Sequence, residues 1–404
     1  MTTQLERLLE AKSTLVVVGP GGVGKTTSAA ALAVQGARMG KKVLVLTIDP
    51  ARRLANALGL EGLGNEEVRV DPALFVEAGV PLTSGALFAM MLDVKSTFDS
   101  LIERHAQSPE ARDRILGNRF YQQASTALAG SQEYMAMEKL YEVREERDYD
   151  LIVLDTPPMV NAVEFLSAPD RLEGFLESGS LRVLLAGVRT AGRFGMGFMK
   201  LNSRILNVMN RFVGAEAFLS LLEFIESFQE MFEGFRKRAS RVRGLFSSPD
   251  LAFAIVTSTD QVALDEGLAF YDRLREDGMP FGALVVNRVR TGDIATGAHD
   301  ELVDRFLKVA ESAPALGLRD RSRISRVARR VAEANARYDV LAEMDARRIA
   351  AARERLGDAG DQLWPVPLFA RDIHDIGGLA EFGELLGRSS ERAEAEASAS
   401  APQG

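Results

Sequence analysis

The sequence contains no cysteine, and it has only three histidines and one tryptophan among its 404 residues. The absence of thiols excludes disulfide bonds, thiolate metal ligands and a cysteine nucleophile within this chain. The histidines are far apart, at His105, His299 and His374, and do not have the spacing of a zinc site. We therefore expect neither zinc nor cysteine chemistry in this protein.

An excess of positive charge and long apolar runs are also lacking. The formal net charge is -8, and lysine occurs only nine times. No segment reaches the roughly 18 uncharged apolar residues that a membrane-spanning helix needs. The first residues, MTTQLERLLEAK, include acidic side chains and no apolar signal-peptide core. These features favour a cytoplasmic protein and give no overall electrostatic reason to bind nucleic acid.

Short runs of Val, Ile and Leu alternate with longer segments of helical character along most of the chain. Such runs are typical of strands that are buried on both faces of a parallel sheet. We therefore predict an α/β fold with a mostly parallel, doubly wound sheet. The predicted strands cover residues 14–19, 42–49, 149–156, 181–188, 251–258, 281–287 and 362–369.

One domain is predicted to extend over residues 1–388. The intervals 70–148 and 189–250 are too long for a simple crossover between parallel strands, so we interpret them as helical insertions. The last residues, 389–404, read SSERAEAEASASAPQG. Small polar residues with a proline are typical of a disordered tail.

The stretch VVVGPGGVGKTT, residues 16–27, fits the phosphate-binding pattern G-x-x-x-x-G-K-[ST] between a predicted strand and a predicted helix. Glycines let backbone N–H groups converge on phosphate oxygens, and the helix N-terminus adds its positive dipole end. In this pattern the lysine binds the β- and γ-phosphates and the hydroxyl residue binds Mg²⁺, roles that belong here to Lys25 and Thr26. The predicted nucleotide contacts are Gly19, Gly21, Gly22, Val23, Gly24, Lys25, Thr26 and Thr27.

Two aspartates end predicted strands, at the edge where parallel sheets bind their ligands. Asp49 follows VLVLTI, and Asp155 follows LIVL. We assign Asp155 to the water shell of Mg²⁺ and Asp49 to the orientation of an attacking water, so that Asp49 and Lys25 are the predicted catalytic residues. The alternative for each aspartate is a capping role at the helix that follows it.

The order GGVGKTT, DPARRLANALG, DTPP with a later FL, and VVNR resembles the ArsA-like ATPases of the arsenite-pump and tail-anchored-protein-targeting family, within the P-loop NTPase class. The similarity spans residues 10–388 in motif order, and GSQEYMAMEKLYEV (130–143) is similar to bacterial members. The resemblance implies an ATPase that uses ATP and Mg²⁺, with Thr26 and Asp155 at the metal.

Two further residues are assigned through this resemblance alone. Asn287 in VVNR matches the residue that reads adenine. Pro367 belongs to PVPLFARDIHDIGGL (365–379), which is similar to the segment that closes over the base. The resemblance therefore implies a preference for ATP over GTP.

Pro20 departs from the family pattern. Family members usually have a signature lysine just after the first loop glycine, where it contacts nucleotide across a dimer interface. Proline offers neither a charge nor an N–H group. Three compensations are open: a nearby arginine such as Arg52, Arg53 or Arg193, a heterodimer with a lysine-bearing paralogue, or very slow hydrolysis. We favour the heterodimer over the homodimer.

The absence of cysteine also bears on the ligand. Tail-anchored-protein targeting factors hold an interfacial zinc on a cysteine pair, and trivalent arsenic is usually captured by thiolates. Neither group is expected here, so the arsenical part of the resemblance implies ancestry rather than activity.

Residues 193–246 contain nine of the 21 phenylalanines and four of the 13 methionines. Two runs with helical spacing predict two amphipathic helices. Their apolar faces either pack on the protein itself or, as the resemblance implies, form a groove for a hydrophobic helix client. The runs are Phe194, Phe198, Leu201, Ile205, Met209 and Phe212, then Phe218, Leu221, Leu222, Ile225, Phe228, Phe232 and Phe235.

The Arg-rich stretch 319–356 is predicted to be a salt-bridged helix rather than a nucleic-acid-binding surface. Its predicted packed face consists of Ile324, Val327, Val331 and Ala334. Together these features predict a Mg²⁺-dependent ATPase whose hydrolysis is coupled to dimer closure and to reshaping of the helical insertion. Three cellular roles stay open: driving a membrane-protein partner in anion efflux, chaperoning hydrophobic helices, and acting as a nucleotide-dependent switch.

Overall fold

The computed structural model describes residues 2–48, 53–124, 131–156, 220, 224, 232–292, 299–312 and 320–400. Its centre is an eight-stranded sheet with the strand order β3-β4-β2-β5-β1-β6-β7-β8. Neighbouring strands are parallel except for the β3–β4 pair, which is antiparallel. The predicted α/β fold with a mostly parallel sheet is therefore confirmed.

The predicted strands are found at nearly the expected places, except that 181–188 lies outside the described residues. Two further strands, β3 and β4, were not predicted. The β4 segment ALFAMM contains no β-branched residue, so it lacks the signal on which the other predictions depended. The strands are β1 (Thr14–Val18), β2 (Lys42–Thr47), β3 (Val68–Arg69), β4 (Ala86–Met91), β5 (Leu151–Asp155), β6 (Leu251–Ser258), β7 (Phe281–Val289) and β8 (Leu363–Pro367).

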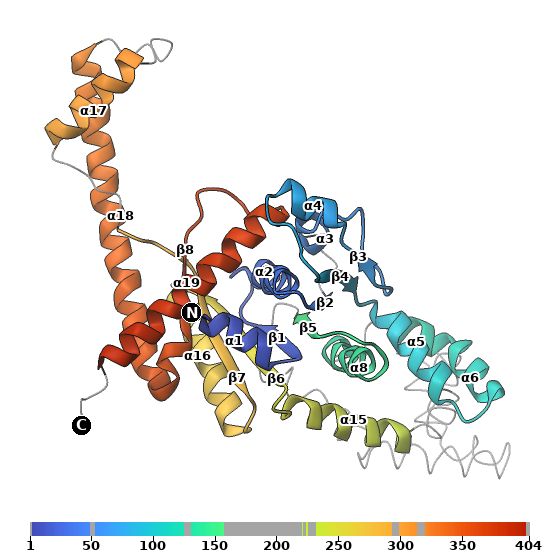
Figure 1. Cartoon of the computed structure of the whole chain (residues 1–404). Coiled ribbons are helices and arrows are strands. Elements are labelled where there is room, and N and C mark those ends of the chain that lie inside the picture. The colour runs from blue at the N-terminus through green and yellow to red at the C-terminus, as the bar shows by residue number, and fades with distance from the viewer. Residues whose placement is uncertain are drawn as a thin grey trace, which may run out of the picture.

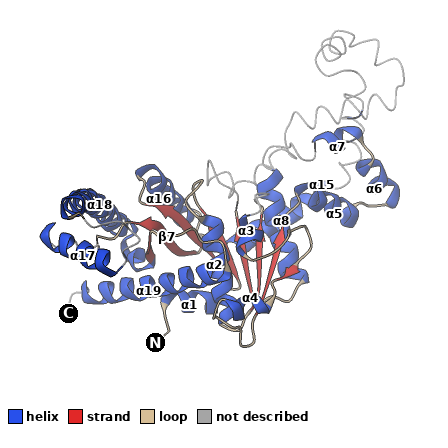
Figure 2. Ribbon diagram, turned by 90° about the horizontal axis from the view of Figure 1, so that it is seen from above, coloured by secondary structure: helices blue, strands red, loops and turns tan. Residues whose placement is uncertain are grey.

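Helices cover both faces of the sheet, as Figure 2 shows. The described helices are α1 (Gln4–Ala11), α2 (Lys25–Arg38), α3 (Arg53–Ala57), α4 (Pro72–Glu77), α5 (Val94–His105), α6 (Pro109–Leu116), α7 (Arg119–Ala124), α8 (Ser131–Glu146), α15 (Phe232–Phe246), α16 (Gln261–Glu276), α17 (His299–Ser312), α18 (Arg321–Leu356) and α19 (Ile376–Ser400). A 3₁₀ turn, η2 (Gly357–Gln362), joins α18 to β8.

The central strand β1 has buried side chains on both faces, because successive residues of a strand point to opposite sides. Leu15 and Val17 belong to a core formed with α1, α2, α3, α4 and α19. Val16 and Val18 belong to the opposite core, formed with α5, α8, α15, α16 and the C-terminal part of α18. This double burial explains the continuous Val and Leu run of the sequence.

The two predicted helical insertions differ from the structure in one respect. The interval 70–148 is helical over α4 and α5 to α8, but it also contributes β4 to the sheet next to β2. Most of the interval 189–250 lies outside the described residues. Its C-terminal part, α15, packs against the sheet through Val242 and Phe246, whose ring centroid is 5.9 Å from that of Phe253 on β6.

The predicted disordered tail from residue 389 requires a correction, because α19 continues to Ser400. Ser390 is completely buried. Its hydroxyl donates to the Gly387 carbonyl at 2.6 Å and accepts from the Leu5 backbone N–H at 3.3 Å. Contact with α1 therefore stabilises the helix beyond the point where the composition becomes polar.

The α17–α18 hairpin projects away from the sheet, as Figure 1 shows. The predicted salt-bridged helix is confirmed in α18, with i,i+4 ion pairs Arg329–Glu333 and Arg347–Glu343. Its packed face is only partly the predicted one. Ile324 is buried against α17, whereas Val327 and Ala334 are exposed.

Within the described ranges, no helix is long and apolar enough to cross a membrane. The same ranges contain no group of three or more His, Asp or Glu side chains arranged to hold a metal ion.

Candidate functional site

The phosphate-binding loop connects β1 to α2 at the carboxyl edge of the sheet. Gly24 precedes the helix with a φ of 101°, in the left-handed region that glycine adopts without steric cost. The amide of Asn287 would lie 2.4 Å from a Cβ at this position, so a larger residue is excluded there. The loop therefore presents its backbone and the start of α2 to one side, as the sequence pattern predicts.

The side chains of Lys25, Thr26 and Thr27 line a cavity of about 300 Å³ beside this loop. Lys25 is 7% exposed, and its Nζ donates a 2.6 Å hydrogen bond to the carbonyl of Pro20. The lysine is thus held within its own loop, next to the loop atoms that bind phosphates in this class of site. Gly22 and Gly24 also line the cavity, whereas the buried Val23 does not.

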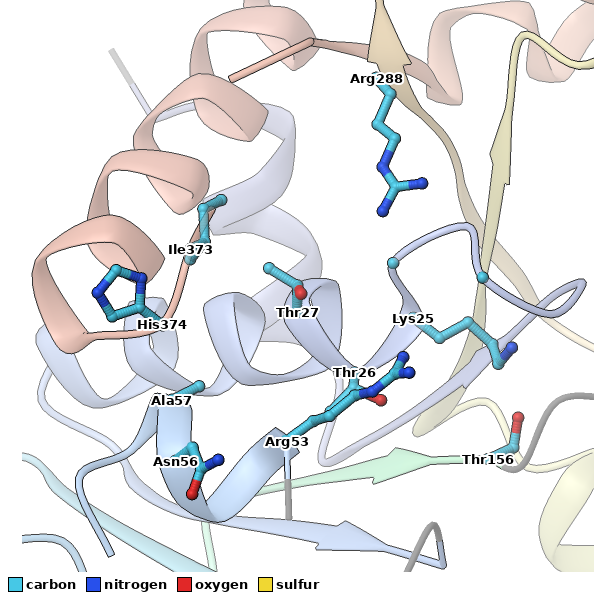
Figure 3. A pocket seen from close by; sticks show the side chains of 12 residues that line it. Lys25, Thr26, Thr27, Arg53, Asn56, Ala57, Thr156, Arg288, Ile373 and His374 are labelled. Atoms are coloured by element: carbon cyan, nitrogen blue, oxygen red, sulfur yellow. The ribbon is translucent and has the colours of Figure 1, made fainter. Parts of the chain in front are cut away.

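Three segments that are far from the loop in sequence complete the walls of the cavity, as Figure 3 shows. Helix α3 contributes Arg53, Asn56 and Ala57; the end of β7 contributes Arg288; and the connection before α19 contributes Ile373 and His374. Thr156, directly after β5, is the remaining wall residue, and its hydroxyl donates to the Val17 carbonyl at 2.8 Å.

The charge of the cavity suits a polyanion. Lys25, Arg53 and Arg288 are cationic, and no carboxylate is among the described residues that line it. Figure 3 shows the Arg53 side chain extending from α3 toward Thr26, while Arg288 extends from the opposite wall. Fixed positive charge and loop N–H groups together provide the environment that a nucleoside triphosphate requires.

Asp155 lies at the end of β5 and is completely buried. Its Oδ2 accepts a 2.9 Å hydrogen bond from the Thr47 hydroxyl, at the end of the neighbouring strand β2. The Thr26 hydroxyl faces the cavity from α2. Mg²⁺ usually keeps several waters and takes only a few oxygen ligands from the protein. The Thr26 hydroxyl and the Asp155 carboxylate, at the same edge of the sheet, therefore fit the predicted metal.

Asn287 does not line the cavity. Its Nδ2 donates to the Val23 carbonyl at 2.8 Å, and its Oδ1 accepts from the Arg288 backbone N–H at 2.9 Å. Pro367 does not line it either; it borders a separate cavity of about 730 Å³ together with Pro365 and Arg290. The adenine-contact roles of Asn287 and Pro367 therefore stay predictions.

Asp49, the predicted water-orienting residue, lies outside the described residues, two positions beyond the end of β2. Arg52 and Arg193 are outside them as well. Gly19 and Gly21 belong to the described loop but do not line the cavity.

Six wall residues were not predicted: Asn56, Ala57, Thr156, Arg288, Ile373 and His374. Ile373 and His374 lie within the stretch 365–379 that the resemblance marks as a nucleotide-covering segment, and Asn56 lies within DPARRLANALG. Only the individual residues were missed there. Arg288 ends the VVNR motif, but the motif does not predict where its side chain points, because that direction depends on the backbone at this position.

A mostly parallel α/β sheet, a loop with the G-x-x-x-x-G-K-[ST] pattern, and a cationic cavity at the carboxyl ends of the strands together define a P-loop NTPase. Residues 12–298 match the family described as anion-transporting ATPase. The match covers more than half of the chain, which therefore belongs to this family of ATPases.

Several curated relatives are also ATPases. The chain is 27% identical over 277 residues to the ATPase get3 of Aspergillus terreus, an alignment that covers 68% of this chain and 72% of the relative. It is 28% identical over 273 residues to the ATPase get3 of Schizosaccharomyces japonicus, covering 67% and 71%. The ATPase GET3 of Malassezia globosa is 32% identical over 171 residues, covering 42% and 46%. These relatives are fungal and do not support the predicted bacterial membership.

Proposed function

We propose that this ATPase hydrolyses ATP in a Mg²⁺-dependent reaction at the cavity beside the phosphate-binding loop. The observation that carries the proposal is the pair of cationic side chains, Lys25 and Arg53, that line the cavity beside Thr26 and the loop, with no carboxylate among the described lining residues. Lys25 and the loop N–H groups bind and stabilise the phosphate oxygens, and Asp49 orients the water for in-line attack. Thr26 and Asp155 would hold Mg²⁺, which supplies charge neutralisation of the phosphates when it is bound.

Replacing Asp49 with asparagine tests the assigned catalytic role. We expect Asp49→Asn to lower the ATP turnover number by at least about a hundredfold, since the oriented water is lost, while the dissociation constant for ATP stays unchanged. Phosphate release and equilibrium binding measure the two quantities separately. The matched control is Asp71→Asn, because Asp71 caps α4 away from the cavity and asparagine caps a helix equally well. Unchanged turnover in Asp49→Asn would remove Asp49 from the mechanism.

The second part of the proposal concerns the positive charge that a lysine at position 20 would supply and that Pro20 cannot. Arg53 lines the cavity within the same chain and extends toward Thr26, which supports compensation by this arginine. A homodimer that closes over ATP then needs no lysine from a paralogue. Arg53→Ala is expected to slow turnover with little change in ATP affinity, because a cation at the transferring phosphate acts mainly in the transition state.

The mass of the protein by light scattering, with phosphate release in the same samples, distinguishes the assemblies. With ATP and Mg²⁺ we expect a dimer that turns over ATP, and a monomer with ADP or without nucleotide. A monomer that binds ATP and barely hydrolyses it would contradict compensation by Arg53. That outcome would favour the heterodimer with a lysine-bearing paralogue.

We also propose that the nucleotide state reaches the insertion 189–250 through β5. Thr156 lines the cavity, and residues 189–250 follow it in the sequence. The Thr47–Asp155 hydrogen bond links the strand that leads to Thr156 with the strand that leads to Asp49. The phenylalanine and methionine content of residues 193–246 supports a hydrophobic helix as client.

Crosslinking of an apolar helical peptide to residues 193–246 tests this role. An ATP-dependent crosslink supports a chaperone. Binding of a protein partner only with ATP, without peptide crosslinks, would favour a nucleotide-dependent switch. Stimulation of turnover by a membrane protein would instead favour the energising subunit of an efflux system.

A further inference from the structure

Strand β7 contains a bulge next to the nucleotide cavity. Val286 pairs with Pro365 and Val289 pairs with Pro367, so β7 has one residue more than β8 over this stretch. A bulge bends the strand and redirects a side chain, and bulges are common beside active sites. The redirected residue here is Arg288.

Arg288 has a φ of 60°, in the left-handed region that a glycine would adopt without steric cost. No other non-glycine residue in the described part of the chain has a positive φ. Side chains are kept in this conformation where the surrounding structure holds them, and such positions concentrate at functional sites. The sequence has placed a large cationic residue where glycine is sterically preferred.

Asn287 holds Arg288 in this conformation. The Asn287 Oδ1 accepts the Arg288 backbone N–H, and the Asn287 Nδ2 donates to the Val23 carbonyl of the phosphate-binding loop. Asn287 itself is only 6% exposed. Its amide therefore couples the loop that binds phosphates to the turn that carries Arg288.

The two ends of the cavity differ. Figure 3 shows Arg53, Lys25 and Thr156 around Thr26, the end where the phosphates and the metal belong. The Arg288 guanidinium lies toward the other end, on the side of Thr27 and Ile373. Since the triphosphate occupies the Thr26 end, the base of the nucleotide extends toward Arg288 and Ile373. A planar guanidinium stacks well on an aromatic ring, and Ile373 offers an apolar surface for a base.

We infer that Arg288 recognises the purine base by stacking its guanidinium on the ring, and that Asn287 acts through Arg288 and the loop as a positioning residue. The role of Arg288 rests on the proposed function, because the phosphate end defines the base end. It adds a base-recognition residue to the ATPase site.

Arg288→Gly tests this role without straining the fold, since glycine adopts the same φ freely. We expect the affinities for ATP and ADP to fall by about tenfold, the scale of a desolvated cation–π contact, and the affinity for inorganic tripolyphosphate to stay unchanged. Arg288→Lys retains the charge without the plane and should not restore ATP affinity. The control is Arg147→Gly, an arginine just after α8 that pairs with Glu67 outside the cavity, and this variant should bind ATP normally.

Asn287→Ala has a different expected result. Because it releases the Val23 carbonyl of the loop, it should weaken tripolyphosphate as well as ATP. Unchanged ATP affinity in Arg288→Gly, an equal loss for tripolyphosphate, or full rescue by lysine would each overturn base stacking. The proposed ATPase function is tested separately, by turnover at saturating ATP. If Arg288→Gly hydrolyses ATP there and Lys25→Ala does not, the proposed function stands whether or not Arg288 stacks on the base.

Discussion

Gly19 lies where the chain leaves β1 and passes the backbone of β6. A Cβ at this position would be 1.9 Å from the Val256 carbonyl oxygen, a distance that two non-bonded atoms cannot adopt, and its φ of 149° is rare for other residues. The first glycine of the loop is therefore required by the contact between two neighbouring strands, in addition to any contact with phosphate. Its place outside the cavity lining is consistent with this packing role.

Gly19→Ala is expected to lower the free energy of unfolding by about 2 kcal/mol or more, the usual scale for overpacking. The added methyl group would separate β1 from β6 and displace the loop, so ATP affinity should fall as well. Denaturant unfolding measures the first effect. Gly62→Ala is the matched control, because nothing lies within 4 Å of its Cβ position, and it should leave stability unchanged. Equal stability of both variants would contradict the close contact.

A local sequence pattern can place some residues of the cavity but not others. Lys25, Thr26 and Thr27 line the same cavity, because spacing within one loop places them side by side. Pro367 and Arg288 depend on how β8 pairs with β7, and the bulge that redirects Arg288 leaves no trace in the sequence.

Helix α8 places charged residues inside the protein. Glu138, Lys139 and Glu142 are at most 6% exposed. Glu138 accepts from Tyr134 and pairs with Arg238 of α15, and Glu142 pairs with Lys139 at 2.9 Å. Burial, followed by the nearby Glu138, raises the pKa of Tyr134, which keeps its hydroxyl protonated for this hydrogen bond. The charges of GSQEYMAMEKLYEV thus join insertion helices, because buried ions need partners.

His105 of α5 belongs to the same network, with its Nε2 2.9 Å from the Arg238 Nη1. Desolvation, followed by Arg238 and Arg104, lowers the pKa of His105 from its ordinary value of 6.5. The unfolded chain therefore binds a proton at this histidine at higher pH than the folded chain does. Because of this linkage, His105 makes its full contribution to the free energy of unfolding above pH 6.5. That contribution decreases as the pH falls below 6.5.

We expect the free energy of unfolding of the wild-type protein to decrease more steeply between pH 6.5 and pH 5 than that of His105→Gln, with the upper limit set by the ordinary histidine pKa. Glutamine retains an acceptor for Arg238 but does not titrate in this range. Urea unfolding at several pH values provides the measurement. Identical pH slopes for the two proteins would show that His105 does not titrate differently in the folded state.

The whole molecule contains more than one packing unit. Ile324 and Ala328 of α18 form a small core with Leu302 and Val303 of α17, separate from the two large cores on the faces of the sheet. The C-terminal half of α18 is attached to the sheet, where Arg290, directly after β7, donates to Asp345. One long helix therefore belongs to two units, of which the projecting one buries much less apolar surface.

Ile324→Ala should open the α17–α18 hairpin while leaving the sheet intact. Removing most of a side chain that is 1% exposed costs about 3 kcal/mol, and the small core around it has few other buried residues to offset that loss. Hydrogen exchange should become faster in α17 and the N-terminal half of α18 and stay unchanged in β1 and β6. Faster exchange throughout the sheet would indicate a single cooperative unit.

The phosphate-binding loop and the α/β class were both readable from the sequence. Each depends on neighbouring residues: glycine conformations or β-branched runs. The insertion of β4 into the sheet, the continuation of α19 beyond residue 388 and the internal charges of α8 depended on contacts between distant segments. Arg53, Arg288 and His374 line the same cavity as the loop only because the strand order brings their elements to one edge of the sheet. Register and strand order are set by long-range packing, which local sequence patterns do not encode.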